Sequence, residues 1–393
     1  MSSGIKVKLS DAFDLQMGKT PSRSVSSYWE GEHSWVSISD LSDSGKYIAK
    51  TKECITDEAI KDSKIKIVPK GTVIMSFKLS IGKTAITASD IFTNEAIIAF
   101  HDKGKYIIDP EYMYYFCCGN NWLKGTNKAV MGLTLNKNTL SNYLINIPSL
   151  LDQKKIISKL NQISEVIENR QRTLTLLDEL VKSRFVEMFG DPIINDMDWN
   201  LEPLKELTNK IGSGATPKGG KQSYQEEGIS LIRSMNVHDG KFLYKDLAHI
   251  NDEQADALKN VIVQSGDVLF NITGASVTRC AIVPNDVLPA RVNQHVCIIR
   301  CKTDRINPVY LNQFLIFDSF KDTLLKTAEA GGATRQAITR RQLEEVHILL
   351  PPLDQQNQFA DFVRQIDITK TAVQRQLDEL KTLRAKLMQD YFG

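Results

Sequence analysis

The chain repeats itself with a period of about 200 residues, and this duplication limits the folds open to it. Leu151-Asp152-Gln153 is matched by Leu353-Asp354-Gln355. Each of these stretches follows an apolar-Pro pair and runs on to an aromatic-Gly pair, Phe189-Gly190 in the first copy and Phe392-Gly393 in the second. A period this long is unlike the 20–50 residues of solenoids. The chain is therefore two copies of one unit.

The segments that precede these stretches also match between the copies. The matched pairs are Gly18-Lys19-Thr20-Pro21 and Gly214-Ala215-Thr216-Pro217, Tyr28 and Tyr224, Gly45-Lys46 and Gly240-Lys241, Gly71-Thr72-Val73-Ile74 and Gly266-Asp267-Val268-Leu269, Lys83-Thr84-Ala85-Ile86 and Arg279-Cys280-Ala281-Ile282, Asn94-Glu95 and Asn293-Gln294. The repeat predicts a globular domain and then a helical arm, twice. The expected boundaries are 1–150, 151–190, 191–350 and 351–393.

Both arms carry apolar residues at alternating gaps of three and four, the heptad pattern of a coiled coil. Cations would fill the remaining seam positions, Arg170 and Arg184 in the first arm and Lys370 and Arg384 in the second. A single heptad stripe is more often a helix packed on its own domain, but two matched stripes can bury each other. We expect an antiparallel coiled coil. The expected seam is Ile156, Leu160, Ile163, Ile167, Leu174, Leu177 and Val181, then Val363, Ile366, Val373, Leu377, Leu380 and Leu387.

The globular parts combine short strand-like runs with helical runs and show no regular βαβ alternation, so we expect an α+β fold. Expected strands include 71–77 and 267–271, and the expected helices are 112–118 and 310–325. Asn307-Pro308-Val309-Tyr310 resembles a methyltransferase motif. Its counterpart begins Asp109-Pro110, so we interpret both as helix starts, with Asp or Asn as N-cap and Pro in the first turn.

Loops rich in Gly, Ser, Thr, Lys and Asn occur at matched places in both copies. Such loops suit phosphates and base edges, although any one of them is more often only a solvated turn. Their matched recurrence predicts paired binding sites, one in each copy. The candidate DNA-binding residues are Lys19, Thr20, Arg23, Lys78, Lys83, Lys128, Lys218, Arg233, Thr273, Arg279, Arg291 and Arg335.

Composition excludes several classes of protein. The 49 Lys and Arg residues and 47 Asp and Glu residues give a net charge of +2, so DNA binding would have to come from local sites. The six cysteines are too few for a disulfide scaffold, and they form no metal-ligand spacing with the histidines. With no signal peptide or apolar membrane run, we expect a cytoplasmic protein. No nucleotide-cofactor, phosphate-loop or nuclease motif is complete, so we expect no catalytic residue, cofactor or metal.

Two divergent domains, each followed by a similar helical arm, resemble the specificity subunit of type I restriction-modification enzymes. The resemblance covers essentially the whole chain, and its marks are the Leu-Asp-Gln entry, the Leu-Asp-Glu-Leu arm and the closing Phe-Gly, each present twice. It implies two target-recognition domains that each read half of a split double-stranded DNA site. It further implies that the arms form a spacer on which two methyltransferase subunits and motor-nuclease subunits assemble.

Three other readings compete with this one. A stand-alone enzyme is disfavoured by the missing motifs, and a fused methyltransferase-nuclease would need several hundred more residues. A coiled-coil scaffold protein without direct DNA readout would keep the arms but would have no need of matched polar loops. The main alternative is therefore the scaffold.

Overall fold

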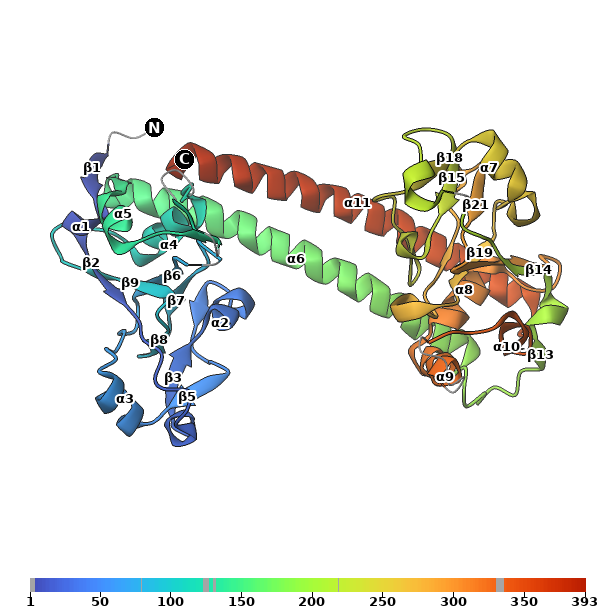
Figure 1. Ribbon diagram of the computed structural model, residues 1–393, viewed down its shortest axis with the longest axis horizontal. Helices are drawn as coiled ribbons and strands as arrows, with labels where there is room; N and C mark the ends of the chain where they lie inside the picture. Colours follow the sequence, from blue (N-terminus) through green and yellow to red (C-terminus); the bar gives the residue numbers. More distant parts are fainter. Residues whose placement is uncertain (1–3, 79, 123–126, 130–131, 218, 330–335) are drawn as a thin grey trace. The chain divides into compact units, whose positions relative to one another are not determined.

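The computed structural model describes residues 4–78, 80–122, 127–129, 132–217, 219–329 and 336–393. These form two compact units (Figure 1): residues 1–171 with 375–393 make unit 1, and residues 172–374 make unit 2. Each unit holds one mixed globular domain and parts of both long helices. The expected α+β class, with two duplicated domains and two long helices, is confirmed.

Unit 1 is built on a five-stranded sheet of order β2-β9-β6-β7-β4, beside a three-stranded sheet of order β5-β3-β8. Alternate residues of β6 face two different apolar clusters, because side chains alternate along a strand. Val73 and Met75 join the cluster under helix α4, whereas Ile74 joins a cluster on the opposite face. The globular elements of unit 1 are β1 (Ile5–Lys8), α1 (Leu9–Ala12), β2 (Phe13–Met17), β3 (His33–Val36), α2 (Ile38–Asp43), β4 (Tyr47–Ile48), β5 (Glu53–Ile55), α3 (Asp57–Ser63), β6 (Val73–Ser76), β7 (Thr84–Thr87), β8 (Phe92–Thr93), β9 (Ile97–Asp102), α4 (Pro110–Gly119), β10 (Asn127–Ala129), β11 (Gly132–Thr134), α5 (Lys137–Asn142) and β12 (Leu144–Ile147).

Unit 2 repeats this plan with a four-stranded sheet of order β14-β22-β19-β20 and a three-stranded sheet of order β18-β15-β21. Val268 and Phe270 of β19 face one cluster and Leu269 faces the other, as in the matched strand of unit 1. The elements are β13 (Leu201–Pro203), β14 (Thr208–Ser213), β15 (Ile229–Ile232), β16 (Val237–His238), β17 (Lys241–Phe242), β18 (Ala248–Ile250), α7 (Asp252–Ala257), β19 (Val268–Asn271), β20 (Cys280–Ile282), β21 (Ala290–Val292), β22 (Val296–Cys301), α8 (Pro308–Ile316), α9 (Asp318–Glu329), α10 (Arg340–Glu344) and β23 (His347–Leu349).

Helices α4 and α8 begin as expected. Asp109 accepts a hydrogen bond from the Glu111 amide at 2.9 Å, and Asn307 accepts one from the Val309 amide at 2.8 Å. Each helix has Pro in its first turn. The N-cap interpretation of both motifs is therefore confirmed.

The single helix expected over 310–325 is wrong, because the chain breaks it at Phe317. Phe317 has an extended backbone, with ψ of 131°, so α8 ends and α9 begins on either side of it. The Phe317 ring lies 5.3 Å from the Phe185 ring. Aromatic packing at this point sets the break, which helical periodicity alone cannot reveal.

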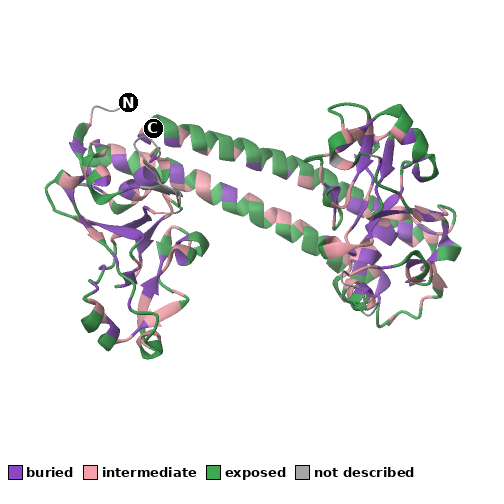
Figure 2. Ribbon diagram, viewed as in Figure 1, coloured by how far each residue is buried: buried purple, intermediate pink, exposed green. Residues whose placement is uncertain are grey.

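The long helices α6 (Leu150–Phe189) and α11 (Leu353–Phe392) have 40 residues each. In unit 1, Leu160 near the start of α6 and Met388 near the end of α11 belong to one apolar cluster. In unit 2, Phe185 near the end of α6 joins Phe359 near the start of α11 in another cluster. The helices are thus antiparallel, and Figure 2 shows that exposed residues predominate along much of both helices.

The seam residues differ in their degree of burial. Those that are buried are Leu160, Ile167, Val181, Val363, Ile366, Val373 and Leu377. Those that are half-buried are Ile156, Ile163, Leu174, Leu177, Leu380 and Leu387. Of the seam cations, Lys370 pairs with Asp178 at 2.5 Å and Arg184 pairs with Glu187 at 2.8 Å. The heptad pattern did not single out Phe185 and Phe189, which are 1% and 0% exposed.

The alignment of Gln153 with Gln355 is wrong by one residue, since Gln356 takes the matching place. Gln153 donates to the Pro148 carbonyl and accepts from the Asp109 amide, at 3.0 and 2.9 Å. Gln356 does the same with Pro351 and Asn307, at 2.8 and 2.9 Å. Both glutamines are fully buried, so each ties a long helix to its domain. Since Leu150 and Leu353 open the two helices, matched helix positions lie 203 residues apart.

Candidate nucleic-acid interface

A tight turn follows the first long strand of each domain and carries the Gly-x-Thr-Pro sequence. Gly18 has no room for a side chain, because a Cβ atom would lie 2.0 Å from the Thr93 carbonyl oxygen. At Gly214, a Cβ atom would lie 1.7 Å from the Val292 carbonyl oxygen. Only glycine lets these backbones approach so closely. Each turn is therefore pressed against the end of a neighbouring strand, with its Thr exposed.

Each turn lies against the end of a strand, where an Asn is followed by Glu95 in unit 1 and by Gln294 in unit 2. The Thr20 hydroxyl donates to a carboxylate oxygen of Glu95, and the Thr216 hydroxyl donates to the amide oxygen of Gln294. Asn293 accepts from the backbone N–H two residues on, at 3.1 Å. In the same way, the Asn94 side chain accepts a hydrogen bond from the Ala96 backbone N–H at 3.0 Å. The two copies thus share these side-chain hydrogen bonds at the turn.

The other polar loops meet this turn in both units. In unit 1 the Phe77 amide donates to the Ala96 carbonyl at 2.9 Å, and the Leu135 amide donates to the Phe77 carbonyl at 3.0 Å. In unit 2 Ile272 bonds in the same way to His295 and Ile338, at 3.0 and 2.9 Å. We call each meeting point a loop cluster, made of 18–23, 77–78, 80–83 and 94–96 in unit 1 and of 214–217, 271–279 and 293–295 in unit 2.

Most cations of the unit 1 loop cluster have protein partners. Lys19 donates to the Ser63 carbonyl at 3.1 Å, and Lys83 donates to the Ser42 hydroxyl. Arg23 pairs with Glu53 and stacks 3.6 Å from the Trp29 ring. The bond to Glu53 raises the pKa of Arg23 above its ordinary value. Lys78 lies 5.2 Å from the Phe77 ring.

An open pocket of about 610 Å³ adjoins the same cluster. Its walls include Lys19, Thr20 and Glu95, together with Tyr28 and Asp62 of the facing segments. The Tyr28 hydroxyl donates to Asp62 at 2.5 Å. The hollow therefore offers two carboxylates and one ammonium group, a polar surface that suits hydrogen bonding to base edges better than apolar contact.

Unit 2 has its own set of partners. The Thr273 hydroxyl lies 2.6 Å from Nδ1 of His295, and the Arg279 guanidinium lies 3.5 Å from Nδ1 of His238. Arg233 donates to the Asp246 carbonyl and lies 5.3 Å from the Tyr224 ring. Of the remaining expected residues, Lys218, Arg335 and the side chain of Lys128 lie outside the described residues.

The expectation for Arg291 is corrected by the structure. Arg291 is 7% exposed, and its guanidinium donates to the carbonyls of Ala255 and Ala290 at 3.1 and 3.0 Å. Burial lowers its pKa below the ordinary value. Strand β21, which carries it, pairs in parallel with β15 inside the domain. Arg291 is therefore a structural residue, and we remove it from the DNA-binding set.

Residues that the polar-loop pattern did not select hold the cluster together. Glu95 and Gln294 are exposed at matched positions, and His295 follows Gln294. Both were visible in the sequence as part of the repeat. Neither is a cation, so the emphasis on cations for phosphate contact passed over them.

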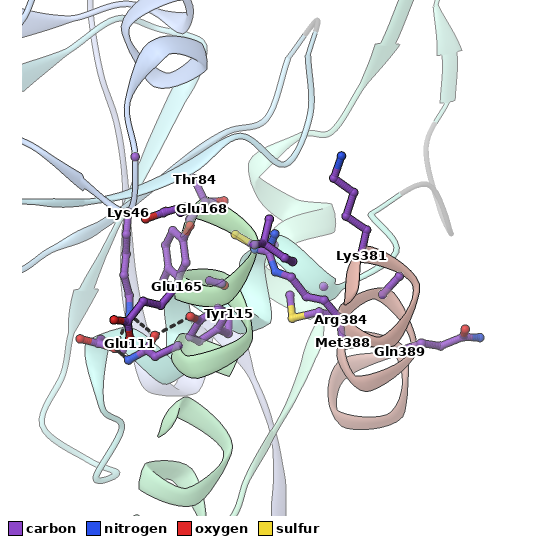
Figure 3. Close-up of a pocket in the computed structure, with 18 of the residues that line it drawn as sticks. Lys46, Thr84, Glu111, Tyr115, Glu165, Glu168, Lys381, Arg384, Met388 and Gln389 are labelled. Carbon is purple, nitrogen blue, oxygen red and sulfur yellow. Dashed lines mark hydrogen bonds and ion pairs between the residues drawn. The ribbon is translucent and has the colours of Figure 1, made fainter. Parts of the chain in front are cut away.

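A second hollow in unit 1 is an open pocket of about 1110 Å³ among α4, α6, α11 and the β4 segment. Figure 3 shows Lys46, Glu111 and Tyr115 together, and Arg384 and Met388 of α11 nearby. Glu111 pairs with Lys46 and accepts hydrogen bonds from Tyr47 and Asn161, at 2.7 and 2.9 Å. Burial would raise the pKa of Glu111, but these bonds hold it below its ordinary value. We call Lys46, Tyr47, Glu111, Tyr115 and Asn161 the polar junction; it joins the domain to α6.

Within the described part of the chain, no group of three or more His, Cys, Asp or Glu side chains is placed to hold a metal ion. The described helices include none long and apolar enough to cross a membrane. The cysteines of the described residues are unpaired, and burial raises the pKa of the Cys280 thiol well above its ordinary value.

Comparison with known proteins gives one consistent result. Residues 4–178 and 197–382 match the family described as type I restriction modification DNA specificity domain. The MjaIX specificity subunit of Methanocaldococcus jannaschii is 22% identical, over 97% of this chain and 90% of that protein. The EcoBI specificity subunit of Escherichia coli is 22% identical, over 62% of this chain and 56% of that protein.

Solved structures show the same fold. The S subunit of the type I restriction-modification system of M. genitalium aligns with a TM-score of 0.57 and 13% identity, over 100% of this chain and 96% of that one. A chain from a study of complex assembly and conformational transition in a type I system aligns with a TM-score of 0.62 and 19% identity, over 99% and 97%.

Proposed function

Because the chain belongs to the family of type I restriction-modification DNA specificity subunits, we propose that it selects the DNA site for such a complex in the cytoplasm. Each globular domain reads one half of a bipartite double-stranded site through its loop cluster. The observation that carries this proposal is the recurrence of the same turn, Gly18 to Pro21 and Gly214 to Pro217, with the same hydrogen bonds. A scaffold protein without DNA readout would have no use for two such exposed turns.

The chain carries no catalytic step in this proposal. Two methyltransferase subunits supply the methyl transfer, and motor-nuclease subunits supply translocation and cleavage. The docking surface we propose for them is the outer side of the long helices. Several large apolar side chains are exposed on these helices, and where such residues gather into a contiguous patch they mark an interaction site. They are Val166, Leu176, Leu180 and Val186 on α6, and Ile368 and Leu383 on α11.

The decisive experiment exchanges residues 191–350 for the equivalent domain of a relative with a different target. The hybrid and the parent are each assembled with the methyltransferase subunit and used to select sites from random double-stranded DNA. One half of the selected sequence should change while the other half stays the same. If both halves change together, the modular reading is wrong. If the parent selects no sequence at all, the scaffold reading is favoured.

A further inference from the structure

Glu95 and Gln294 occupy the same place in two nearly identical turns. Each follows an Asn whose backbone N–H bonds to the strand beside it, Asn94 to the Val36 carbonyl and Asn293 to the Ile232 carbonyl, both at 3.0 Å. Each accepts a hydrogen bond from the exposed Thr of the facing turn. The copies therefore differ here by an acid-to-amide exchange on a shared frame. Glutamate and glutamine have the same shape, so the difference is one of hydrogen-bonding chemistry.

Glu95 offers only acceptors. Its carboxylate is exposed beside Thr20 and Lys19, and one oxygen is already engaged by the Thr20 hydroxyl. The other oxygen remains available to a donor. In the major groove the base donors are the amino groups of cytosine and adenine, and acidic side chains pair typically with cytosine N4. A carboxylate repels the phosphate backbone. If the loop cluster faces DNA, Glu95 is therefore suited to contact a base and not a phosphate.

Gln294 offers a donor and an acceptor, and its orientation is set by two neighbours. Its amide oxygen accepts from Thr216, and its amide nitrogen lies 3.1 Å from Nε2 of His295. In this arrangement Nε2 of neutral His295 is the acceptor, and the proton on Nδ1 points to the Thr273 hydroxyl 2.6 Å away. One lone pair of the Gln294 amide oxygen and one of its amide hydrogens have no partner among the described residues, and an amide carries both in one plane. That fork matches N6 and N7 of adenine.

We propose that Glu95 and Gln294 are the matched base-reading residues of the two domains. Glu95 accepts from a base amino group, with cytosine preferred, and Gln294 pairs with adenine. Thr20 and Thr216 are positioning residues that fix these side chains, and His295 adds a second restraint in unit 2. This inference rests on the proposed DNA readout and adds to it the residue and the base chemistry in each half-site.

The test is an exchange of the two side chains. Glu95→Gln gives unit 1 the chemistry of unit 2, and Gln294→Glu does the reverse. Both variants keep the oxygen that accepts from Thr. The whole chain with its methyltransferase subunit is used to select sites from random double-stranded DNA, and binding to each base at the altered position is then measured. Each variant should change the preference at one base position of one half-site, by about fivefold to about 150-fold, and should leave the other half-site unchanged.

Asp11→Asn is the matched control. Asp11 is an exposed carboxylate of α1 in unit 1, and Asp11→Asn changes the net charge by the same amount as Glu95→Gln. It should leave every base preference unchanged, while both variants and the control keep the circular dichroism of the parent. Thr20→Val and Thr216→Val test the positioning role: each should weaken discrimination at the same base position as its partner.

Two results overturn the proposal. One is an unchanged base preference in both exchange variants. The other is a uniform loss of affinity for all sequences, which would show that the side chains only support the turn. If the parent chain selects no DNA sequence, the proposed function fails as well. A parent that selects a bipartite site, with variants that select the same site, refutes this inference alone.

Discussion

In unit 1 the globular domain meets α6 through the polar junction, where Glu111 binds Lys46, Tyr47 and Asn161. In unit 2 the matched helix α8 meets α6 through rings, and the same rings of α6 meet Phe359 of α11. Tyr310 lies 4.8 Å from Phe189, and Phe359 lies 5.5 Å from Phe185. We call Phe185, Phe189, Tyr310, Phe314, Phe317 and Phe359 the aromatic junction. Unit 1 keeps the matched ring contact, since the Tyr112 ring lies 5.4 Å from the Phe392 ring, but it has Met388 at the place of Phe185. The duplicated template thus shares one ring contact, to which unit 1 adds a polar junction and unit 2 adds further rings.

The difference can be followed at matched positions. Phe185 on α6 is matched by Met388 on α11. Phe317, which follows the end of α8, is matched by Gly119, the last residue of α4. The smaller residues of unit 1 leave the open pocket lined by Gly119 and Met388. Apolar packing depends on area and shape, whereas the polar junction depends on each of its partners being present. The two attachments should therefore respond to different perturbations.

The largest expected effect is at the aromatic junction. Phe185 is 1% exposed, so Phe185→Ala should destabilise unit 2 by about 3–5 kcal/mol. Met388→Ala, its matched change, should cost unit 1 about 2 kcal/mol, because Met388 borders an open pocket. Hydrogen exchange measured by mass spectrometry reports each unit separately. An equal loss in both units would show that the junctions do not differ in packing.

The next effect concerns the buried acid of the polar junction. Glu111→Val installs the residue that α8 carries at the matched position, Val309. It leaves Tyr47 without its acceptor and Lys46 without its counter-charge, although Lys46 still donates to Asn161 at 2.7 Å. We expect a loss of about 1–3 kcal/mol in unit 1. Adding Lys46→Met should recover part of it, because a half-buried cation without a counter-charge is then removed. The same exchange measurement applies, and a double variant no better than the single one would contradict the charge argument.

The polar junction should also depend on pH. The pKa of Glu111 is lowered in the folded chain, so its stabilising contribution is complete above the unfolded value of about 4.3. It is lost as the pH falls below that value through the folded pKa. The stability difference between the parent and Glu111→Val should therefore be constant near neutral pH and shrink below about pH 4. The difference between the parent and Phe185→Ala should not converge in this way, which supplies the control.

The smallest effect lies between the long helices in unit 2. Lys370 and Asp178 form an ion pair whose side chains are 32% and 60% exposed. Asp178→Ala should cost no more than about 1 kcal/mol, because water screens such pairs. Exchange of the α6 and α11 amides within unit 2 measures it. A loss as large as that of Phe185→Ala would mean that the seam is held by charge and not by its apolar residues.

Much of this fold could be predicted because it depends on local pattern. The heptads of both arms, the caps at Asp109 and Asn307 and the matched turns all follow from residue type and spacing. The break at Phe317 and the burial of Arg291 could not be predicted, because both depend on contacts made elsewhere in the chain. Phe317 packs on Phe185, and Arg291 is enclosed when β21 pairs with β15.

The loop clusters show the same division. The repeat located Gly18 and Gly214 and the Thr residues beside them. It did not reveal that Glu95 and Gln294 receive the hydrogen bonds of those Thr residues, since the partners are separated by 75 and 78 positions. Nor could spacing show that Lys19 and Lys83 already have partners within the domain.

Unit 1 is completed by a segment from the far end of the sequence, residues 375–393. On the ribosome, the first domain emerges long before Met388 and Phe392, which belong to its apolar cluster. The intervening residues, 172–374, take roughly 10–40 s to synthesise at about 5–20 residues per second. During that time the first domain lacks part of its core, and a chain broken off early never acquires it. The first domain can therefore complete its apolar core only after the second domain has been synthesised.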